Sequence, residues 1–377
     1  MKIPTSYLRM TAIAVLTAGL IGCGGGGGDG GPAIPTASNA AISPPPTTAV
    51  AIAAGAQTTN TTIAAAAFQG VNGAGLQTIG NLPSLAGAVT TTPAATETRR
   101  LMIAEIVRRH AEKIKDYMGS APVAGAQIVQ TVPCLVGGTE TAVVDDMNGN
   151  FSQIFVNCDE GGVIFHGTIS STGVSANVTL GSTVGSSYNI SVTATITIDL
   201  SITVTNTNPA TVLVSQGSFS FSVALSGTMV SGGTSGVMPG SPTHTETRIT
   251  GPSLLASDGV VGGVVNNEQL ANFDLTVVDD DVTGTTVTVG SHFTYANNAS
   301  AINGAVTVNI TTPIHYALGA VHPDAGVIEI TSTVSTGKIR VTFAASGVTP
   351  VKVEVLADGV NVSDTYTLSW VQFDALI

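Results

Sequence analysis

The chain has 377 residues, a formal net charge of −12 and only 10% charged residues. Nucleic-acid-binding proteins normally carry a basic surface, and here 24 Asp and Glu outnumber 12 Lys and Arg, so this class is excluded. Three cysteines are too few for a disulfide-rich scaffold, and one short apolar run is too little for a polytopic helical membrane protein.

Residues 1–22 have the composition of a secretion signal. Lys2 and Arg9 make the start of the chain positive, and the apolar stretch from Met10 to Leu20 is too short to span a bilayer as a stable helix. The stretch ends in Leu20-Ile21-Gly22-Cys23. This ending resembles the lipobox of bacterial lipoproteins, in which a small residue precedes the cysteine that is lipidated.

The resemblance implies that the signal is cut before Cys23 and that this residue carries acyl chains, palmitate among them. Several acyl chains hold a protein firmly, whereas a single chain binds a membrane only marginally. In this family an Asp directly after the cysteine favours retention in the inner membrane, and here Gly24 occupies that position. The resemblance therefore implies a lipid anchor in the outer membrane of a Gram-negative bacterium, on the periplasmic face or the cell surface.

The next segment, residues 23–95, is predicted to be a lipidated flexible tether. It is rich in Gly, Ala, Thr and Pro, and after Cys23 its single charged residue is Asp29. Most of it lacks a periodic apolar pattern, so it cannot bury enough surface to become ordered. Ile63 to Leu85 is the part for which a weak helix or local packing is the alternative.

Residues 96–119 predict an amphipathic helix. Thr96 is a suitable N-cap, and Gly119 follows the last apolar position. The apolar residues recur at spacings of three and four, whereas basic residues occupy most of the other face. We expect this helix to pack on a sheet through its apolar face; the alternative is a basic helix that lies on anionic lipid or on a partner.

Residues 120–377 predict an antiparallel β domain. Apolar and hydroxyl side chains alternate with period two, most clearly from Tyr188 to Thr205, and no crossover helix separates the runs. Spacing gives about ten to fourteen strands. Turn signals are Asp258-Gly259, Asn303-Gly304, Thr336-Gly337 and Asp358-Gly359.

The predicted fold class is therefore mainly β, with one long antiparallel curved sheet, an open half-barrel, and a single N-terminal helix packed on it. A β-sandwich is the alternative. The length of the run from Tyr188 to Thr205 favours the curved sheet, because so long a strand must bend or contain a bulge. Few aromatic residues and the ending Asp374-Ala375-Leu376-Ile377 argue against a transmembrane barrel.

With Cys23 lipidated, Cys134 and Cys158 remain, and export to an oxidising compartment predicts that they form a disulfide. A hairpin that turns near Asn148-Gly149 brings them together, and a bulge near Gly137-Gly138 adjusts the register. This stretch resembles a loose pattern in uncharacterised β-rich envelope lipoproteins of Gram-negative bacteria, in which a cysteine hairpin opens a long meander. The resemblance concerns architecture and implies no activity.

The sequence contains none of the common catalytic, nucleotide-binding or haem-binding motifs, so we expect neither an enzyme nor a cofactor. The six histidines are scattered singly, and the pairs His244/Glu246 and His322/Asp324 are incomplete metal sites. Two acidic clusters offer hard oxygen ligands for Ca²⁺, with solvated turns as the alternative. They consist of Asp145, Asp146 and Asn148, and of Asp279, Asp280 and Asp281.

These features predict a membrane-anchored lipoprotein of the cell envelope that acts as a non-catalytic binding or carrier module for an apolar ligand. The alternative is a structural or adhesive surface module. The expected partners are the membrane, through the lipid anchor, and an apolar ligand or an envelope protein. The sequence leaves the identity of the ligand and the oligomeric state open.

Overall fold

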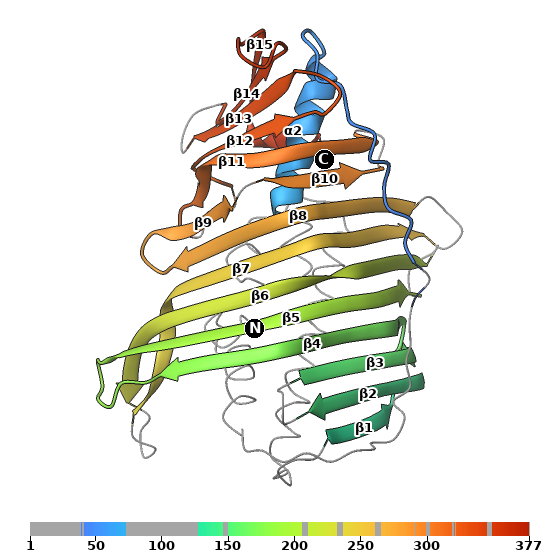
Figure 1. Ribbon diagram of the computed structural model, residues 1–377, viewed down its shortest axis with the longest axis vertical. Helices are drawn as coiled ribbons and strands as arrows, with labels where there is room; N and C mark the ends of the chain where they lie inside the picture. The colour runs from blue at the N-terminus through green and yellow to red at the C-terminus, as the bar shows by residue number, and fades with distance from the viewer. Residues whose placement is uncertain are drawn as a thin grey trace. The chain divides into compact units, whose positions relative to one another are not determined.

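The computed structural model describes residues 39, 41–72, 127–145, 150–205, 210–231, 237–260, 265–290, 292–298, 302–318, 320, 322–344 and 349–376. In this part the chain is mainly β, and its fifteen strands belong to one sheet (Figure 1). The predicted fold class is thus confirmed. The alternative of a two-sheet sandwich is wrong, because a single hydrogen-bonded strand order connects the strands.

The strands are β1 (Gln127–Pro133), β2 (Gly137–Asp145), β3 (Asn150–Asp159), β4 (Val163–Thr179), β5 (Ser187–Val204), β6 (Thr211–Ser231), β7 (Val237–Val260), β8 (Val265–Asp280), β9 (Gly284–Val289), β10 (Phe293–Asn297), β11 (Gly304–Tyr316), β12 (Ala325–Thr331), β13 (Lys338–Ala344), β14 (Val351–Leu356) and β15 (Asp364–Leu368). The helices are α2 (Gln57–Asn72) and α5 (Trp370–Asp374). Strands adjacent in sequence are adjacent in the sheet, except that β9 and β10 both lie between β8 and β11. No described helix is both long and apolar enough to cross a membrane.

The chain divides into two compact units. The first unit contains β1 to β6 and both ends of β7, and the second contains α2, the middle of β7 (Arg248–Asp258), β8 to β15 and α5. In the first unit every residue of β5 has a partner on β6, from Ser187 opposite Thr228 to Val204 opposite Thr211. Bulges interrupt the β3–β4 and β4–β5 pairs, and bulges bend strands locally.

The second unit buries α2 against β12, β13 and β14. The run Ala64–Ala67 has high helix propensity, and its small side chains allow the helix to approach the sheet closely. Buried residues occur on every side of the helix, including Ile63, Phe68 and Val71. The Phe68 ring lies 4.7 Å from Phe343 of β13 and 5.8 Å from Phe373 of α5, measured between centroids.

Residues 41–72 differ from the flexible tether that their composition predicts. Thr48 and Val50 form backbone hydrogen bonds with both polar groups of Ala305, and the amide of Ile52 donates to the Ser335 hydroxyl. Two glycines make room for this segment, since a Cβ at Gly304 would lie 2.3 Å from the Thr48 carbonyl oxygen and one at Gly337 would lie 2.6 Å from that of Ile52. Long-range backbone pairing therefore orders a stretch that has no apolar period of its own.

The α2 helix overlaps the alternative weak helix within Ile63 to Leu85 but begins earlier, at Gln57. The predicted signal, residues 1–22, and the predicted helix, residues 96–119, lie outside the described residues, as does the remainder of the tether apart from Asn39. Asn39 docks on the first unit, where its amide donates to Asp199 and its side chain donates to the His166 carbonyl.

Gly70→Ala tests whether packing outweighs helix propensity in α2. A Cβ at this position would lie 2.6–3.0 Å from three ring carbons of the buried Tyr295, whose hydroxyl is held by Asn297. Alanine in a helix gains about 1 kcal/mol over glycine, whereas overpacking a core costs about 1–3 kcal/mol, so we expect a net loss of up to about 2 kcal/mol. Denaturant unfolding measures it.

The matched control is Thr62→Ala on the same helix. Its hydroxyl bonds only within the helix, to the Thr58 carbonyl, so this change should be neutral or slightly stabilising. A stabilised Gly70→Ala variant would contradict the steric argument.

Candidate functional site

The first unit has a long apolar face, which we define by the alternate residues of β5 from Tyr188 to Ile202 and their partners on β6 from Leu213 to Gly227. Opposite residues of an antiparallel pair point to the same side of the sheet, so this register brings several apolar residues of the two strands together. Ile190 faces Leu225, Val192 faces Val223, and Ile202 faces Leu213. The other face of β5 carries Thr and Ser, of which Ser191 and Thr193 are exposed.

The middle of this apolar face is incompletely covered. Ile196 of β5 and Phe221 and Val223 of β6 are only partly buried, whereas their neighbours on the same face, such as Val192 and Phe219, are buried. Ile196 lies opposite Phe219, and Phe221 lies opposite Ala194. Solvent therefore reaches large apolar side chains at the centre of the face. Binding sites for apolar ligands are usually lined by accessible apolar side chains of this kind.

A buried polar pair lies on the same face. Glu140 of β2 pairs with Phe155, which pairs with Gly167, which pairs with Leu200, so these four residues share one side of the sheet. Gln153 shares that side, and its amide donates to the Glu140 carboxylate over 2.5 Å. Both side chains are buried, so the apolar face includes at least two hydrogen-bonding groups at its β2–β3 end.

The sequence indicated the alternation that makes this face but did not indicate the polar pair. Glu140 and Gln153 lie in short strands of mixed composition, Gly137–Asp145 and Asn150–Asp159, where polar residues also mark the solvent side. Only the register across four strands assigns them to the same side as Leu200. A polar residue at an otherwise apolar alternation position was the one available signal.

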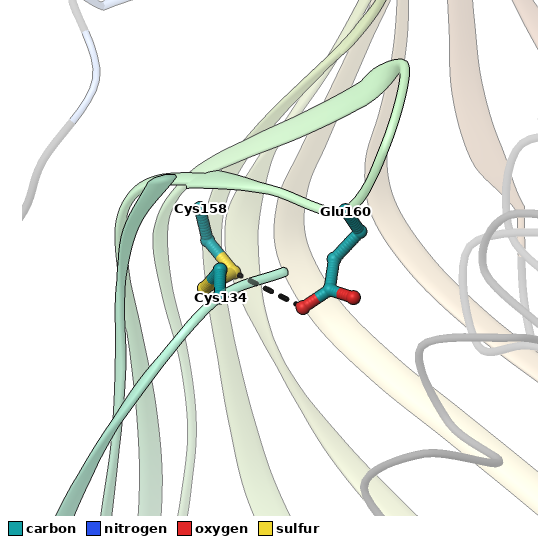
Figure 2. Close-up of side chains that lie close together, drawn as sticks. All are labelled: Cys134, Cys158 and Glu160. Carbon is teal, nitrogen blue, oxygen red and sulfur yellow. Dashed lines mark hydrogen bonds between the residues drawn. A yellow bond between two sulfur atoms is a disulfide. The ribbon is translucent and has the colours of Figure 1, made fainter. Parts of the chain in front are cut away.

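The predicted disulfide is present. Cys134 follows β1 and Cys158 lies in β3, with their Cα atoms 5.3 Å apart (Figure 2). The predicted bulge is confirmed as well, since the β2–β3 register shifts between Gly137 and Thr139. Gly138 has a φ of 78°, and a Cβ there would lie 2.0 Å from the Asn157 carbonyl oxygen, so this bulge requires glycine.

The Glu160 carboxylate lies beside the disulfide. Its Oε1 is 3.7 Å from the Cys158 Sγ, and Figure 2 draws this contact. The sulfur carries no proton in a disulfide, so it donates no hydrogen bond. Cys134, Cys158 and Glu160 are also the one group among the described residues that brings three potential metal ligands together. The disulfide consumes both thiolates, so this group is not a metal site in the oxidised protein.

Asp279, Asp280 and Asp281, one of the two candidate clusters for Ca²⁺, lie at the end of β8 and in the turn that follows it. Asp280 accepts hydrogen bonds from the amides of Val282 and Thr283, and Asp279 accepts one from the Thr285 hydroxyl. These bonds shape the β8–β9 turn, and Asp281, the third candidate, is an exposed residue of this turn. In the other cluster, Asp145 ends β2 opposite Asn150, while Asp146 and Asn148 lie outside the described residues, as does Cys23.

The histidines form pairs that differ from those suggested by sequence spacing. His322 pairs with Asp374 of α5 at 3.0 Å and stacks on Trp370, with ring centroids 4.4 Å apart. Asp324 instead pairs with His315, whose Nδ1 lies 2.5 Å from the carboxylate. The other ring nitrogen of His315 lies 2.7 Å from the Thr283 carbonyl oxygen, so it donates there.

Two acceptors therefore flank His315, and only the doubly protonated ring can donate to both. The hydrogen bond to Asp324 is the largest cause that raises the pKa of His315, and partial burial opposes it. The arrangement links the end of β11 to the β8–β9 turn. His315 therefore holds these two segments together through hydrogen bonds that require a protonated ring. We call this arrangement the clasp.

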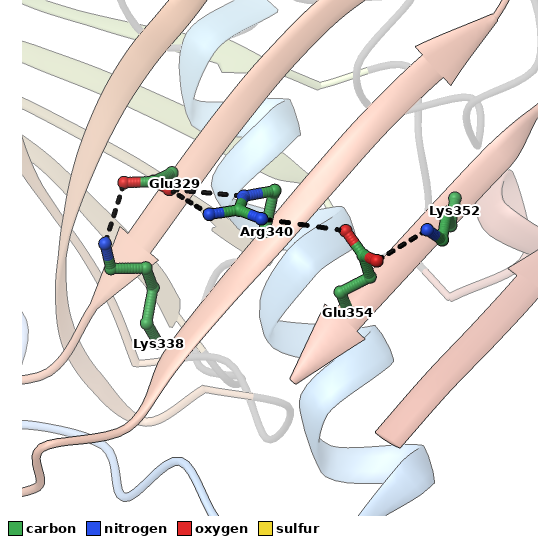
Figure 3. A network of polar contacts seen from close by, with 5 residues as sticks. All are labelled: Glu329, Lys338, Arg340, Lys352 and Glu354. Atoms are coloured by element: carbon green, nitrogen blue, oxygen red, sulfur yellow. Dashed lines mark hydrogen bonds and ion pairs between the residues drawn. The ribbon is translucent and has the colours of Figure 1, made fainter. Parts of the chain in front are cut away.

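An alternating column of charges crosses β12, β13 and β14 (Figure 3). Glu329, Arg340 and Glu354 lie opposite one another in register. Lys338 bonds Glu329 at 2.9 Å, and Lys352 bonds Glu354 at 2.5 Å. Burial alone would raise the pKa of Glu329, but its hydrogen bonds to Lys338 and Arg340 outweigh this effect and lower it.

These charges lie on the opposite side of the sheet from Ile328, Ile339 and Val353, which alternate with them and are buried. Cross-strand ion pairs of this kind contribute roughly 0.2–1 kcal/mol each. All five charges have oppositely charged neighbours, so we interpret the column as a register-fixing surface rather than a ligand site.

No protein-family model, curated protein or solved structure matches this chain.

Removal of the disulfide by Cys134→Ser together with Cys158→Ser should lower the free energy of unfolding by about 3 kcal/mol, because the bond closes a sizeable loop in the unfolded chain. Guanidinium unfolding of the variant and the parent protein measures the difference. A reductant should shift the midpoint of the parent protein and leave that of the variant unchanged. Equal midpoints for the oxidised parent and the variant would contradict this expectation.

The stability contributed by His315 should depend on pH. Because its folded pKa is raised above the unfolded value of about 6.5, the contribution is fully present below that pH and is lost as the pH rises through the folded pKa. His315→Gln should therefore lower the thermal midpoint more at pH 5 than at pH 9. The side chain is about one-third exposed, so we expect an effect of at most about 1 kcal/mol. His244→Gln, on β7, is the control, and an equal loss at both pH values for His315→Gln would argue against the clasp.

Proposed function

We propose that the protein is a lipid-anchored module of the bacterial cell envelope that binds an apolar ligand without catalysis. The observation that carries the proposal is the incompletely covered apolar face of the first unit, with Ile196, Phe221 and Val223 partly accessible in a row of buried neighbours. Apolar surface of this kind is stabilised by an occupant that removes it from water, at roughly 25 cal/mol per Å².

The polar pair and the disulfide at the β2–β3 end of the apolar face support the proposal. At the β2–β3 end, the Glu140–Gln153 pair provides polar groups, and ligand sites typically combine a mostly apolar lining with a few polar groups that orient the ligand. The disulfide fixes the strand that carries Phe155 and Cys158, and Phe155 packs on Phe165 with ring centroids 5.6 Å apart. A rigid frame lowers the conformational cost of binding.

The anchor part of the proposal depends on Cys23 and on the lipobox resemblance. A tethered binding module collects an apolar ligand close to the membrane, where such ligands are concentrated. The outer membrane of a Gram-negative bacterium is the proposed location, and Gly24 after the cysteine supports it. Metabolic labelling with a radioactive or clickable palmitate tests this part separately, since Cys23→Ser should abolish the label.

Ligand binding is tested with the mature chain from residue 23 that carries Cys23→Ser. Organic extraction and mass spectrometry of the purified protein should find a co-purified lipid, and a fluorescent fatty acid should bind with saturation. Phe221→Ser removes accessible apolar surface and should weaken probe binding by about five- to tenfold. Ser222→Ala, on the opposite face of β6, should leave probe binding unchanged.

The alternative is a structural or adhesive surface module. Absence of extractable lipid together with equal probe binding by Phe221→Ser and the parent protein would favour it. The specific observation that motivates this alternative is the Thr- and Ser-rich face of β5 and β6, where Thr197 and Ser218 form a cross-strand hydroxyl bond of 3.1 Å.

A further inference from the structure

Charge is distributed unevenly along the chain. From Gly161 to Thr245 the sequence contains one Asp, Glu, Lys or Arg, namely Asp199, although the whole protein has a net charge of −12. Asp199 lies within β5 and is engaged by the Gln216 side chain and the Asn39 amide. The ends of β4 to β7 that lie farthest from it along these strands are therefore free of formal charge.

These uncharged ends expose large apolar side chains. We define the hairpin tips as Val178, Leu180 and Val184 around the β4–β5 turn, and Val230 and Met238 at the facing ends of β6 and β7. Their exposed fractions include 51% for Leu180, 60% for Val184 and 46% for Met238. Most of the large exposed apolar residues that the structure describes in the first unit belong to this set.

Hydrogen bonds connect the hairpin tips into one surface. The Gly185 amide donates to the Met229 carbonyl, and the Met229 amide donates to the Ser186 carbonyl, each over 2.8 Å, so the β4–β5 turn is bonded to the end of β6. Within the turn, Ser186 bonds Thr183 through both its amide and its hydroxyl. Thus the exposed side chains are carried by a fixed backbone.

A cluster of buried side chains packs next to the hairpin tips. Tyr188, Ile190, Leu225 and Met229 are buried together, and the Tyr188 hydroxyl donates to the Gly240 carbonyl of β7 over 2.9 Å. Tyr188 lies against Gly227, where a Cβ would be 2.8 Å from its ring. Three neighbouring strands, β5, β6 and β7, are thereby joined beneath the exposed residues.

We propose that the hairpin tips insert into the headgroup region of a neutral lipid bilayer. Leu, Val and Met gain free energy on leaving water, and no ionic group at the tips has to be desolvated. The acidic remainder of the protein is repelled by anionic lipid, so the uncharged tips are the part of the first unit best able to approach a membrane. This contact would orient the protein on the membrane and is independent of the acyl chains and of any ligand on the apolar face.

Vesicle flotation tests the proposal with the unlipidated mature chain that carries Cys23→Ser. The probes are vesicles of phosphatidylcholine and phosphatidylethanolamine, with and without phosphatidylglycerol. The protein should float with the neutral vesicles to the same extent at low and high NaCl, because the attraction is apolar and salt screens only charges. Added phosphatidylglycerol should not increase binding.

Leu180→Asp and Val184→Asp should each lower the partition coefficient by about tenfold, because a charge replaces an inserted apolar side chain. Both positions are exposed, so unchanged thermal midpoints will verify that the variants fold. Val360→Asp is the matched control, since Val360 is 76% exposed in a turn of the second unit and should have no effect. Phe221→Ser should float normally, which separates this test from that of the apolar face.

Leu180→Trp provides a second measurement. Its emission should shift to shorter wavelength when vesicles are added, against the constant signal of Trp370, which packs on Phe343 and His322. Three results would overturn the proposal: no flotation with neutral vesicles, equal effects of Leu180→Asp and Val360→Asp, or no spectral shift. If Leu180→Asp instead changed the sedimentation coefficient without changing flotation, the tips would be a contact between copies of the chain.

Discussion

The antiparallel register between β5 and β6 is the constraint on which the first unit depends. Side chains alternate between the faces of a strand, so a slip of one residue would move the whole apolar row to the hydroxyl side. Every residue from Ser187 to Val204 has a partner, and Ile190, Val192 and Ile202 meet apolar partners on β6. The same register carries the apolar face proposed for a ligand and, at the strand ends, the turn that presents Leu180 and Val184.

The second unit depends on a different interaction, because a buried helix fills the space over its sheet. The α2 helix packs its alanines and Phe68 over β12 to β14, while the outer side of the same strands carries paired charges. The segment before the helix is held by hydrogen bonds to the Ala305 backbone and to the side chains of Ser335 and Asp364. The two units thus differ in how their apolar faces are covered. In the second unit a helix packs over the face, whereas in the first unit some apolar side chains remain accessible.

Charge placement separates the two units as well. Glu329, Arg340, Glu354 and their lysine partners fix the register of strands that need a solvated outer side. In contrast, β4 to β6 rely on hydroxyl side chains for solubility and contain Asp199 as their single formal charge. Hydroxyl groups tolerate the interfacial region of a membrane much better than carboxylates do, and this difference connects the composition of the first unit to its proposed position at a membrane.

Local patterns in the sequence determined the strand content, the length of β5 and the cysteine pair, because alternation and cysteine count act over short distances or through simple chemistry. One local signal was misleading, since Asp258-Gly259 predicts a turn but lies inside β7. The tertiary structure alone decided three features. These are the ordered backbone of residues 41–72, the Glu140–Gln153 pair, and the pairing of Asp324 with His315 instead of His322. Each depends on backbone or side-chain partners far away in sequence, and a local sequence pattern does not indicate which distant groups come into contact.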